Sequence, residues 1–210
     1  MKRKLLLKNC RPITYPHTRS TTDILIENGI IKKVSHMNCA PDNCEIIDAS
    51  NRSAAPGFID VHIQGAGGAD VLDGTEQALH TISSTCARFG VTGFLATTVF
   101  KKNGDNCHIS NAARMVGKHL GGASLLGIHL EGPFISSTKR GMIQPDSICD
   151  PSPTVLEDVL EITGDALKIM TIAPELEHNL DIIRRLSKKG VIASIGHTNC
   201  SYHTALRGIE

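Results

Sequence analysis

Three side chains able to bind a metal follow apolar runs of the kind that form buried strands. "FIDVHIQG" contains His62, "GIHLEGPF" contains Glu131 and "IASIGHTN" contains His197. Glu131 is the most informative, because an unpaired carboxylate at the end of a buried strand costs several kcal/mol or more. Gly132 and Pro133 follow it at once and end the strand. A bound cation would compensate this charge, so we interpret Glu131 as a metal ligand.

These three side chains lie on different predicted strands. That spacing excludes a local zinc finger and favours a site assembled across the mouth of a parallel barrel. Imidazole and carboxylate ligands without a thiolate suit a hydrolytic metal, with zinc as the first choice and iron, manganese or cobalt as alternatives. Such a metal would lower the pKa of a bound water to about 7 and polarise a carbonyl group. A lone histidine in an apolar strand is more often a core residue, which is our interpretation of His129.

From residue 57 onward, apolar runs alternate with segments of helical spacing. The strand-like runs cover residues 58–63, 92–99, 124–130, 167–173 and 191–196. Apolar residues at helical spacing lie between them, including Leu79, Ile82, Cys86 and Phe89, and Leu176, Leu180 and Ile183. This alternation is typical of a parallel βα array, in which all strands end on the same face.

Helix ends are also marked in the sequence. Gly90 and Gly190 stand where a helix needs a left-handed residue at its carboxyl end. Ser152 followed by Pro153 is a favourable cap and first position for a helix. We therefore expect helices to end before the two glycines and one to begin at Pro153.

Residues 1–56 have a different pattern. "KLLLKN" and "DILIENGIIKKVS" are short and strand-like, and the second contains Asn28-Gly29, the strongest short-range hairpin signal. We assign residues 1–56 to the N-terminal part of a small β subdomain and residues 57–210 to an incomplete barrel. The predicted fold class is α/β: a partial (β/α)8 TIM-like barrel of about five βα units, preceded by half of a small β-sandwich subdomain.

The composition excludes several classes of partner. The 210 residues contain 22 Lys and Arg against 21 Asp and Glu, so no net field attracts nucleic acid or an anionic membrane. The apolar runs are far shorter than the roughly 20 residues of a membrane span, and the N-terminus lacks a secretory signal. The seven cysteines are scattered without a Cys-x-x-Cys pair. These features predict a cytoplasmic protein with reduced thiols.

Five stretches of the sequence resemble one family of enzymes. "PGFIDVHIQGAGGAD", "LGIHLEGPFIS", "KRGMIQP", "MTIAPE" and "GHTNCSYHTAL" are similar to N-acetylglucosamine-6-phosphate deacetylases, a family of the amidohydrolase superfamily. "HLEGPF" and "APE" followed by "GHTN" are specific, whereas "PGFIDVH" is shared by many amidohydrolases. The resemblance runs along the whole chain.

The resemblance implies roles for particular residues. Glu131 and His197 would be metal ligands, and Met142, Ile143 and Gln144 would lie in a loop that covers the sugar. The implied reaction is metal-dependent hydrolysis of the acetamide of N-acetylglucosamine 6-phosphate to glucosamine 6-phosphate and acetate. The implied partner is this small amino-sugar phosphate, and the full-length protein would be a homodimer.

The sequence departs from the family at two places. Amidohydrolases with two metals carry His-x-His at the end of the first strand, whereas this chain has His62, Ile63 and Gln64. His62 is therefore retained only as a ligand of a second metal. The loop "KRGMIQP" carries Ile143 where some relatives have a histidine. In "GAGGAD", no helix with a dinucleotide fingerprint follows, so we expect its glycines to allow a tight turn beside the metal.

The length of the barrel segment gives a further expectation. A complete barrel takes about 250 residues, so residues 57–210 supply about five of its eight units. The resemblance implies that another metal-binding histidine, the phosphate contacts and an aspartate acting as general acid and base lie beyond Glu210. We therefore expect no catalytic residue within the 210 residues, and an inactive fragment. Two alternatives stay open: another amidohydrolase acting on a cyclic or sugar amide, and a non-catalytic chain that binds a sugar phosphate.

Overall fold

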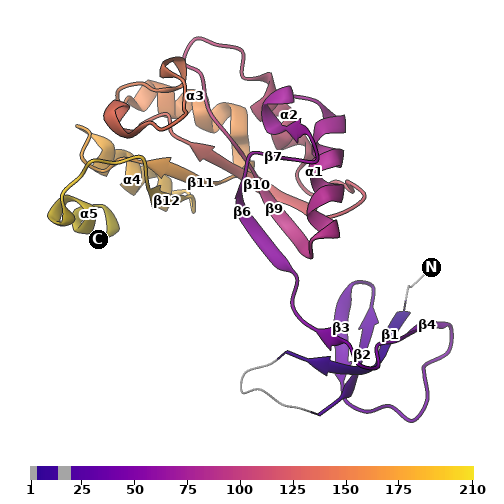
Figure 1. The fold of residues 1–210 in the computed structure, drawn as a ribbon. Helices are drawn as coiled ribbons and strands as arrows, with labels where there is room; N and C mark the ends of the chain where they lie inside the picture. Colours follow the sequence, from indigo (N-terminus) through magenta and orange to yellow (C-terminus); the bar gives the residue numbers. More distant parts are fainter. Residues whose placement is uncertain (1–3, 14–19) are drawn as a thin grey trace. The chain divides into compact units, whose positions relative to one another are not determined.

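The computed structural model describes residues 4–13 and 20–210, which form parts of two compact units, Met1–Pro56 and Gly57–Glu210. The first unit is a five-stranded sheet in which β1 pairs with three partners (Figure 1). The order is β3-β2-β1-β4, with β5 paired to the far end of β1. Its strands are β1 (Lys4–Pro12), β2 (Thr22–Glu27), β3 (Ile30–Val34), β4 (Cys44–Asp48) and β5 (Ser53–Ala54).

The predicted hairpin of this unit is confirmed. Strands β2 and β3 are antiparallel and are joined by Asn28 and Gly29, whose φ angles are 52° and 78°. Both angles are positive, as a two-residue turn that matches the twist of the strands requires. The buried residues Cys10, Ile24 and Ala49 form a small apolar core in this unit.

The second unit is built on five parallel strands, which confirms the predicted fold class. Their order is β12-β11-β10-β9-β6, so strands consecutive along the parallel array are also neighbours in space. The strands form a curled half-barrel, and a short antiparallel hairpin of β7 and β8 follows the first of them. The strands are β6 (Phe58–Ile63), β7 (Gly65–Ala66), β8 (Ala69–Asp70), β9 (Val91–Thr98), β10 (Ser124–Glu131), β11 (Leu167–Ile172) and β12 (Ile192–Ile195).

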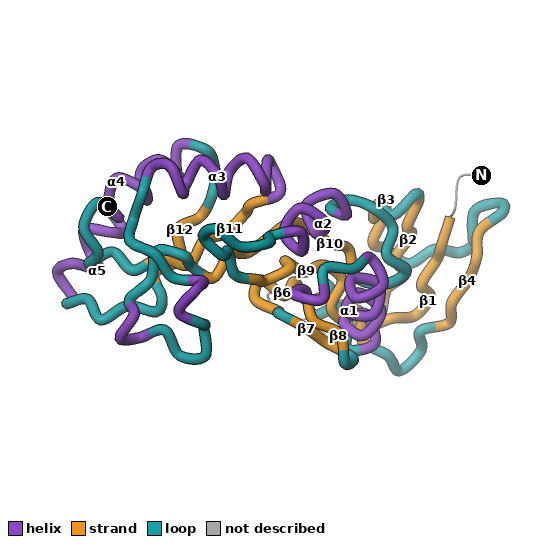
Figure 2. Tube along the Cα trace, turned by 90° about the horizontal axis from the view of Figure 1, so that it is seen from above, coloured by secondary structure: helices purple, strands orange, loops and turns teal. Residues whose placement is uncertain are grey.

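Helices connect the parallel strands and pack along them (Figure 2). Fully buried side chains such as Phe94, Ile128 and Met170 from the strands meet Ile82, Ile109 and Leu156 from the helices in one core. The α-helices are α1 (Glu76–Arg88), α2 (Cys107–Met115), α3 (Pro153–Thr163), α4 (Asn179–Lys188) and α5 (Tyr202–Ile209). Short 3-10 turns are η1 (Val71–Asp73), η2 (Ser137–Lys139), η3 (Pro145–Ser147) and η4 (Gly164–Ala166).

The predicted helix ends are confirmed. Helices α1 and α4 end two residues before Gly90 and Gly190, which have φ angles of 83° and 75°. Helix α3 begins at Pro153, and the Ser152 hydroxyl accepts a hydrogen bond from the amide of Val155. Each end therefore has the local chemistry that its sequence predicts.

The predicted apolar faces of two helices are partly wrong. In α1, Leu79, Ile82 and Cys86 are buried as expected, but Phe89 is 76% exposed. The helix ends at Arg88, so Phe89 follows the turn towards Gly90 instead of the helical face. Leu176 precedes the start of α4, whose fully buried apolar residues are Ile182 and Leu186.

The carboxyl ends of the parallel strands bring the predicted ligand-bearing segments to one rim. Strand β10 ends at Glu131, and His62 is the last residue but one of β6, which ends at Ile63. Strand β12 ends at Ile195, two residues before His197. Because parallel strands share a direction, their final residues lie on the same face. None of the helices in the described residues has the length and apolar character that a membrane span requires.

Candidate active site

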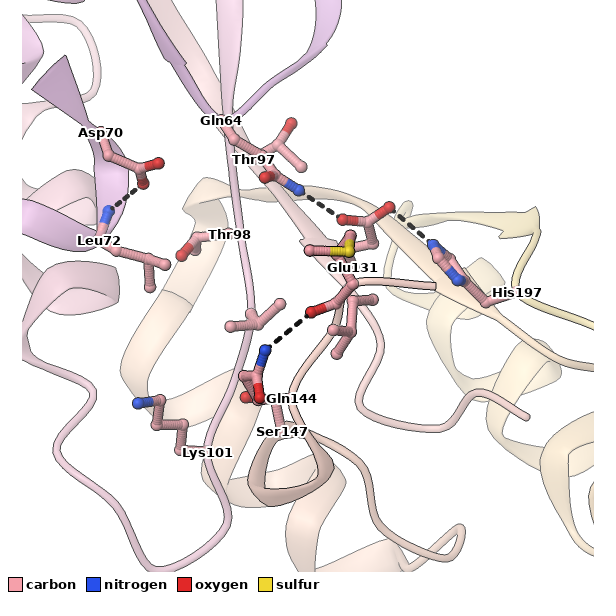
Figure 3. A pocket seen from close by; sticks show the side chains of 13 residues that line it. Gln64, Asp70, Leu72, Thr97, Thr98, Lys101, Glu131, Gln144, Ser147 and His197 are labelled. Atoms are coloured by element: carbon pink, nitrogen blue, oxygen red, sulfur yellow. Dashed lines mark hydrogen bonds and ion pairs between the residues drawn. The ribbon is translucent and has the colours of Figure 1, made fainter. Parts of the chain in front are cut away.

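Glu131 and His197 meet at this rim, which confirms the predicted convergence of their side chains. The Nε2 atom of His197 lies 2.9 Å from Oε1 of Glu131 (Figure 3). Glu131 is 8% exposed, so its carboxylate needs partners within the protein. Their roles as metal ligands remain predictions.

The backbone fixes the orientation of the His197 ring. Its Nδ1 lies 2.9 Å from the carbonyl oxygen of Lys139, and its own carbonyl accepts a hydrogen bond from the amide of Ser136. Because a carbonyl only accepts, Nδ1 must carry the proton, and Nε2 faces Glu131. Burial acts to lower the pKa of His197, but the hydrogen bonds to Glu131 and Lys139 outweigh burial and raise the pKa above its ordinary value.

Gln64 occupies the other oxygen of the carboxylate. Its Nε2 amide donates to Oε2 of Glu131 at 2.6 Å. The sequence marked Gln64 only as the missing second histidine of His-x-His. The structure gives it a contact instead, so the two oxygens of Glu131 have different partners, an imidazole at Oε1 and a carboxamide at Oε2.

His62 lies beside this group without joining it closely. Its Nε2 is 3.6 Å from Oε1 of Glu131, and its side chain is about half exposed. Its Nδ1 is 3.4 Å from Nδ1 of His129. Within the part of the chain that the structure describes, no three His, Cys, Asp or Glu side chains are grouped as a metal site. The role predicted for His62 stays a prediction.

His129 has the environment of a core histidine. It is 5% exposed, and burial lowers its pKa, which favours the neutral form of the ring. Its Nδ1 lies 2.8 Å from the Val61 carbonyl and therefore donates, which leaves Nε2 to accept from the Thr171 hydroxyl at 2.9 Å. Both ring nitrogens are satisfied by neighbouring strands.

A cavity of about 400 Å³ opens over Glu131 and His197. The three residues predicted to cover the sugar all line it, although they differ in exposure: Ile143 is 8% exposed and Met142 is 89% exposed. The side-chain amide of Gln144 donates to the Met142 carbonyl at 3.1 Å, a hydrogen bond within the loop. The full lining is Gln64, Asp70, Leu72, Thr97, Thr98, Val99, Lys101, Glu131, Met142, Ile143, Gln144, Ser147 and His197.

Sequence reasoning missed one side of this cavity. Thr97, Thr98 and Val99 stand at the end of β9, on the same rim as the predicted ligands, and Lys101 follows shortly after. Their position at a strand end was the available signal. They were overlooked because none of the first three side chains titrates.

The glycines of "GAGGAD" form a tight turn. Gly67 and Gly68 join β7 to β8 with φ angles of 65° and 84°. The turn leads to Asp70, which lines the cavity and accepts a hydrogen bond from the Leu72 amide through Oδ1. This hairpin agrees with the expected tight turn, while its relation to a metal remains a prediction.

The donor set at the rim suits a divalent cation. A carboxylate oxygen and an imidazole nitrogen 2.9 Å apart provide two of the ligand types that zinc accepts. The Lys139 carbonyl fixes the proton on Nδ1 of His197, which is how a second contact commonly orients a metal-binding histidine. Glu131 and His197 therefore fit a metal as two of its ligands.

Comparisons with known proteins identify relatives of this chain. No protein-family model matches the chain. The N-acetylglucosamine-6-phosphate deacetylase of Bacillus subtilis is 36% identical over 95% of this chain and 52% of its own length. The deacetylase from Pasteurella multocida superposes with a TM-score of 0.85 at 24% identity, covering 98% of this chain and 54% of that protein.

A third relative was solved with its sugar. A mutant of the Mycobacterium smegmatis deacetylase, in complex with N-acetyl-D-glucosamine-6-phosphate, superposes with a TM-score of 0.78 at 27% identity, covering 99% of this chain and 53% of that protein. The chain spans about half the length of the relatives that it matches. By sequence and by fold, the chain is a homologue of the N-acetylglucosamine-6-phosphate deacetylases.

Proposed function

We propose that these residues serve in the metal-dependent hydrolysis of the acetamide of N-acetylglucosamine 6-phosphate, which yields glucosamine 6-phosphate and acetate. The observation that carries the proposal is the 2.9 Å approach of His197 Nε2 to Glu131 Oε1 beneath a cavity. The substrate is that of the relatives, which are N-acetylglucosamine-6-phosphate deacetylases.

Glu131 and His197 would hold the divalent metal, with zinc as the first choice and iron, manganese or cobalt as alternatives. When bound, the metal supplies an activated water or a polarised amide carbonyl. The protein's own residues prepare this site. Gln64 restrains the second oxygen of Glu131, and the Lys139 carbonyl holds the imidazole of His197 with Nε2 towards the carboxylate.

The cavity would bind the sugar. Its volume of about 400 Å³ lies within the range of small-molecule sites, roughly 300–1,000 Å³. Ile143 and Leu72 provide apolar contact, while Gln144 and Lys101 provide polar groups. Met142 is the most exposed of the loop residues and would lose exposed surface on contact with a ligand.

We further propose that the 210 residues alone do not catalyse the reaction. A catalytic zinc site uses three protein ligands, and the described residues contain no group of three. The family resemblance implies a homodimer, and the composition and scattered cysteines favour a cytoplasmic location.

Acetate release from N-acetylglucosamine 6-phosphate with added zinc tests the proposal. The 210-residue chain is one arm. A chimera with the part of the Bacillus subtilis relative that the alignment leaves uncovered is the second arm, and the same chimera carrying Glu131→Gln is the third. We expect acetate from the second arm only. A chimera whose circular dichroism indicates a folded protein, but which is inactive, would contradict the assigned reaction.

Substrate comparison separates this proposal from the alternatives. The active chimera is assayed with N-acetylglucosamine 6-phosphate, N-acetylglucosamine and a cyclic amide such as dihydroorotate. Preference for the sugar phosphate supports the proposal, whereas preference for the cyclic amide favours another amidohydrolase activity. Binding of the sugar phosphate without turnover would favour a non-catalytic chain.

A further inference from the structure

Glu175 ends the stretch "MTIAPE" and has no role in the site described above. It follows β11, the strand next to β12, and it contacts the loop that carries His197. The Thr198 hydroxyl donates to Oε2 of Glu175 at 2.5 Å, and the backbone amide of Asn199 donates to Oε1 at 2.7 Å. One carboxylate thus binds the two residues that follow His197.

The backbone at His197 needs such support. His197 has a φ of 49°, a left-handed conformation that is uncommon for a residue with a side chain. Conformations of this kind persist only where the surrounding structure holds them. The Thr198 hydroxyl also accepts a hydrogen bond from the backbone amide of Cys200 at 3.0 Å. Glu175, Thr198 and Cys200 are therefore linked by consecutive hydrogen bonds that hold the turn.

We propose that Glu175 is a positioning residue for His197: it holds the turn at residues 198–200 and so directs the His197 imidazole towards Glu131. This inference rests on the proposed function in so far as His197 is a metal ligand. Glu175 contacts the two residues that follow His197 in the chain. The Lys139 carbonyl, by contrast, contacts Nδ1 of the His197 ring itself.

A carboxylate is the group that this position requires. Both of its oxygens accept, and both receive a donor from the loop. In Glu175→Gln one oxygen becomes an NH₂ group, which faces either the Thr198 hydroxyl or the Asn199 amide. In the first case the Thr198 hydroxyl would have to turn so that it accepts instead of donating. In the second case the new NH₂ group would face the backbone N–H of Asn199, which is also a donor.

Glu177 supplies a matched control. It lies two residues from Glu175, its side chain is 89% exposed, and its ion pair is with the adjacent His178 at 3.6 Å. Glu177→Gln makes the same chemical change without touching the loop. Any effect of charge alone on cobalt binding would appear in both variants.

The experiment titrates cobalt into the purified protein and follows its visible absorption, together with the ¹⁵N signals of the His197 ring without metal. For Glu175→Gln we expect cobalt affinity to fall about 10- to 100-fold, as for other residues that orient a ligand. The cobalt band and the metal-free His197 signals should also shift. Glu177→Gln should match the unaltered protein in all three measurements.

The outcomes separate the two proposals. If neither the unaltered protein nor the variants bind cobalt, the result counts against the proposed metal function. A shift of the His197 ring signals confined to Glu175→Gln would still support the positioning role. Unchanged ring signals in folded Glu175→Gln would overturn the inference. If this variant does not fold, Thr198→Val removes one of the two hydrogen bonds and should give the same shifts at smaller size; unchanged signals there would also overturn it.

Discussion

Among the described residues, each of the two units buries one carboxylate, and the two carboxylates have different kinds of partner. In the small sheet, Asp23 is 2% exposed and accepts from the backbone amides of Asn9 and Met37, each at 2.8 Å. In the half-barrel, Glu131 is 8% exposed and contacts the side chains of His197 and Gln64. Burial alone therefore does not identify a functional carboxylate.

The kind of partner distinguishes these two residues. Backbone amides cannot turn away or titrate, so they fix Asp23 as a structural crosslink between β2 and the segments around it. Side-chain partners can rotate, and an imidazole can exchange a proton for a metal. Glu131 also lies under the cavity, and Asp23 is not one of the residues that line it. This contrast predicts that substitutions of Glu131 affect binding, and those of Asp23 affect stability.

The largest effect is expected for Glu131→Gln. Removing the charge should weaken zinc binding by more than about 100-fold, because loss of a ligand exceeds the 10- to 100-fold cost of losing a group that only orients one. Isothermal titration calorimetry measures the affinity. Glu177→Gln, at an exposed carboxylate, is the control and should bind as the unaltered protein does. Equal zinc affinity in Glu131→Gln and Glu177→Gln would contradict the view that Glu131 serves binding while Asp23 serves stability.

Asp23→Asn should instead destabilise the small sheet. One of the two backbone amides would lose its acceptor, at a cost of about 1–3 kcal/mol. Hydrogen exchange at the Asn9 and Met37 amides measures this loss, and zinc affinity should not change. The exposed Asp42→Asn serves as the control. Unaltered exchange in Asp23→Asn would show that these bonds do not stabilise the unit.

Gln64→Ala is expected to have a smaller effect on the site. Gln64 is exposed, so loss of its bond to Glu131 should lower zinc affinity by roughly 10-fold, the lower end for an orienting contact. Gln77→Ala, on the exposed side of α1, is the matched control. Titration calorimetry again provides the measurement, and an affinity equal to that of the control would assign Gln64 no orienting role.

The pH dependence of the small sheet should be the smallest effect. The amide of Asn9, followed by other contacts that outweigh burial, lowers the pKa of Asp23. Its contribution to stability is therefore complete above the unfolded pKa of about 4 and is lost as pH falls through the lower folded pKa. The protection of the Met37 amide, which compares its exchange rate with that of an unfolded amide at the same pH, should fall in this acid range. The fall should be absent in Asp23→Asn; an identical acid profile in that variant would contradict the assignment.

Much of the fold could be predicted because local patterns determine it. The alternating runs of residues 57–210 predicted all five parallel strands, and Asn28-Gly29 predicted the hairpin. The exposure of Phe89 could not be predicted, since a helix that ends one residue earlier moves that side chain out of the core.

The site was predictable to a smaller extent. Strand ends identified Glu131 and His197, because a parallel array brings such ends together. The contact between Gln64 and Glu131 and the hydrogen bonds of Glu175 were not predictable from spacing. Each depends on the side-chain direction and register between strands that are far apart in the sequence.

The location of zinc tests the central claim most directly. Crystals grown with zinc would be measured at the zinc absorption edge, where anomalous scattering identifies the metal. We expect a zinc ion about 2.0–2.2 Å from both Oε1 of Glu131 and Nε2 of His197, with the direct contact between the two side chains broken. Zinc bound elsewhere, with Glu131 and His197 still hydrogen-bonded to each other, would contradict it.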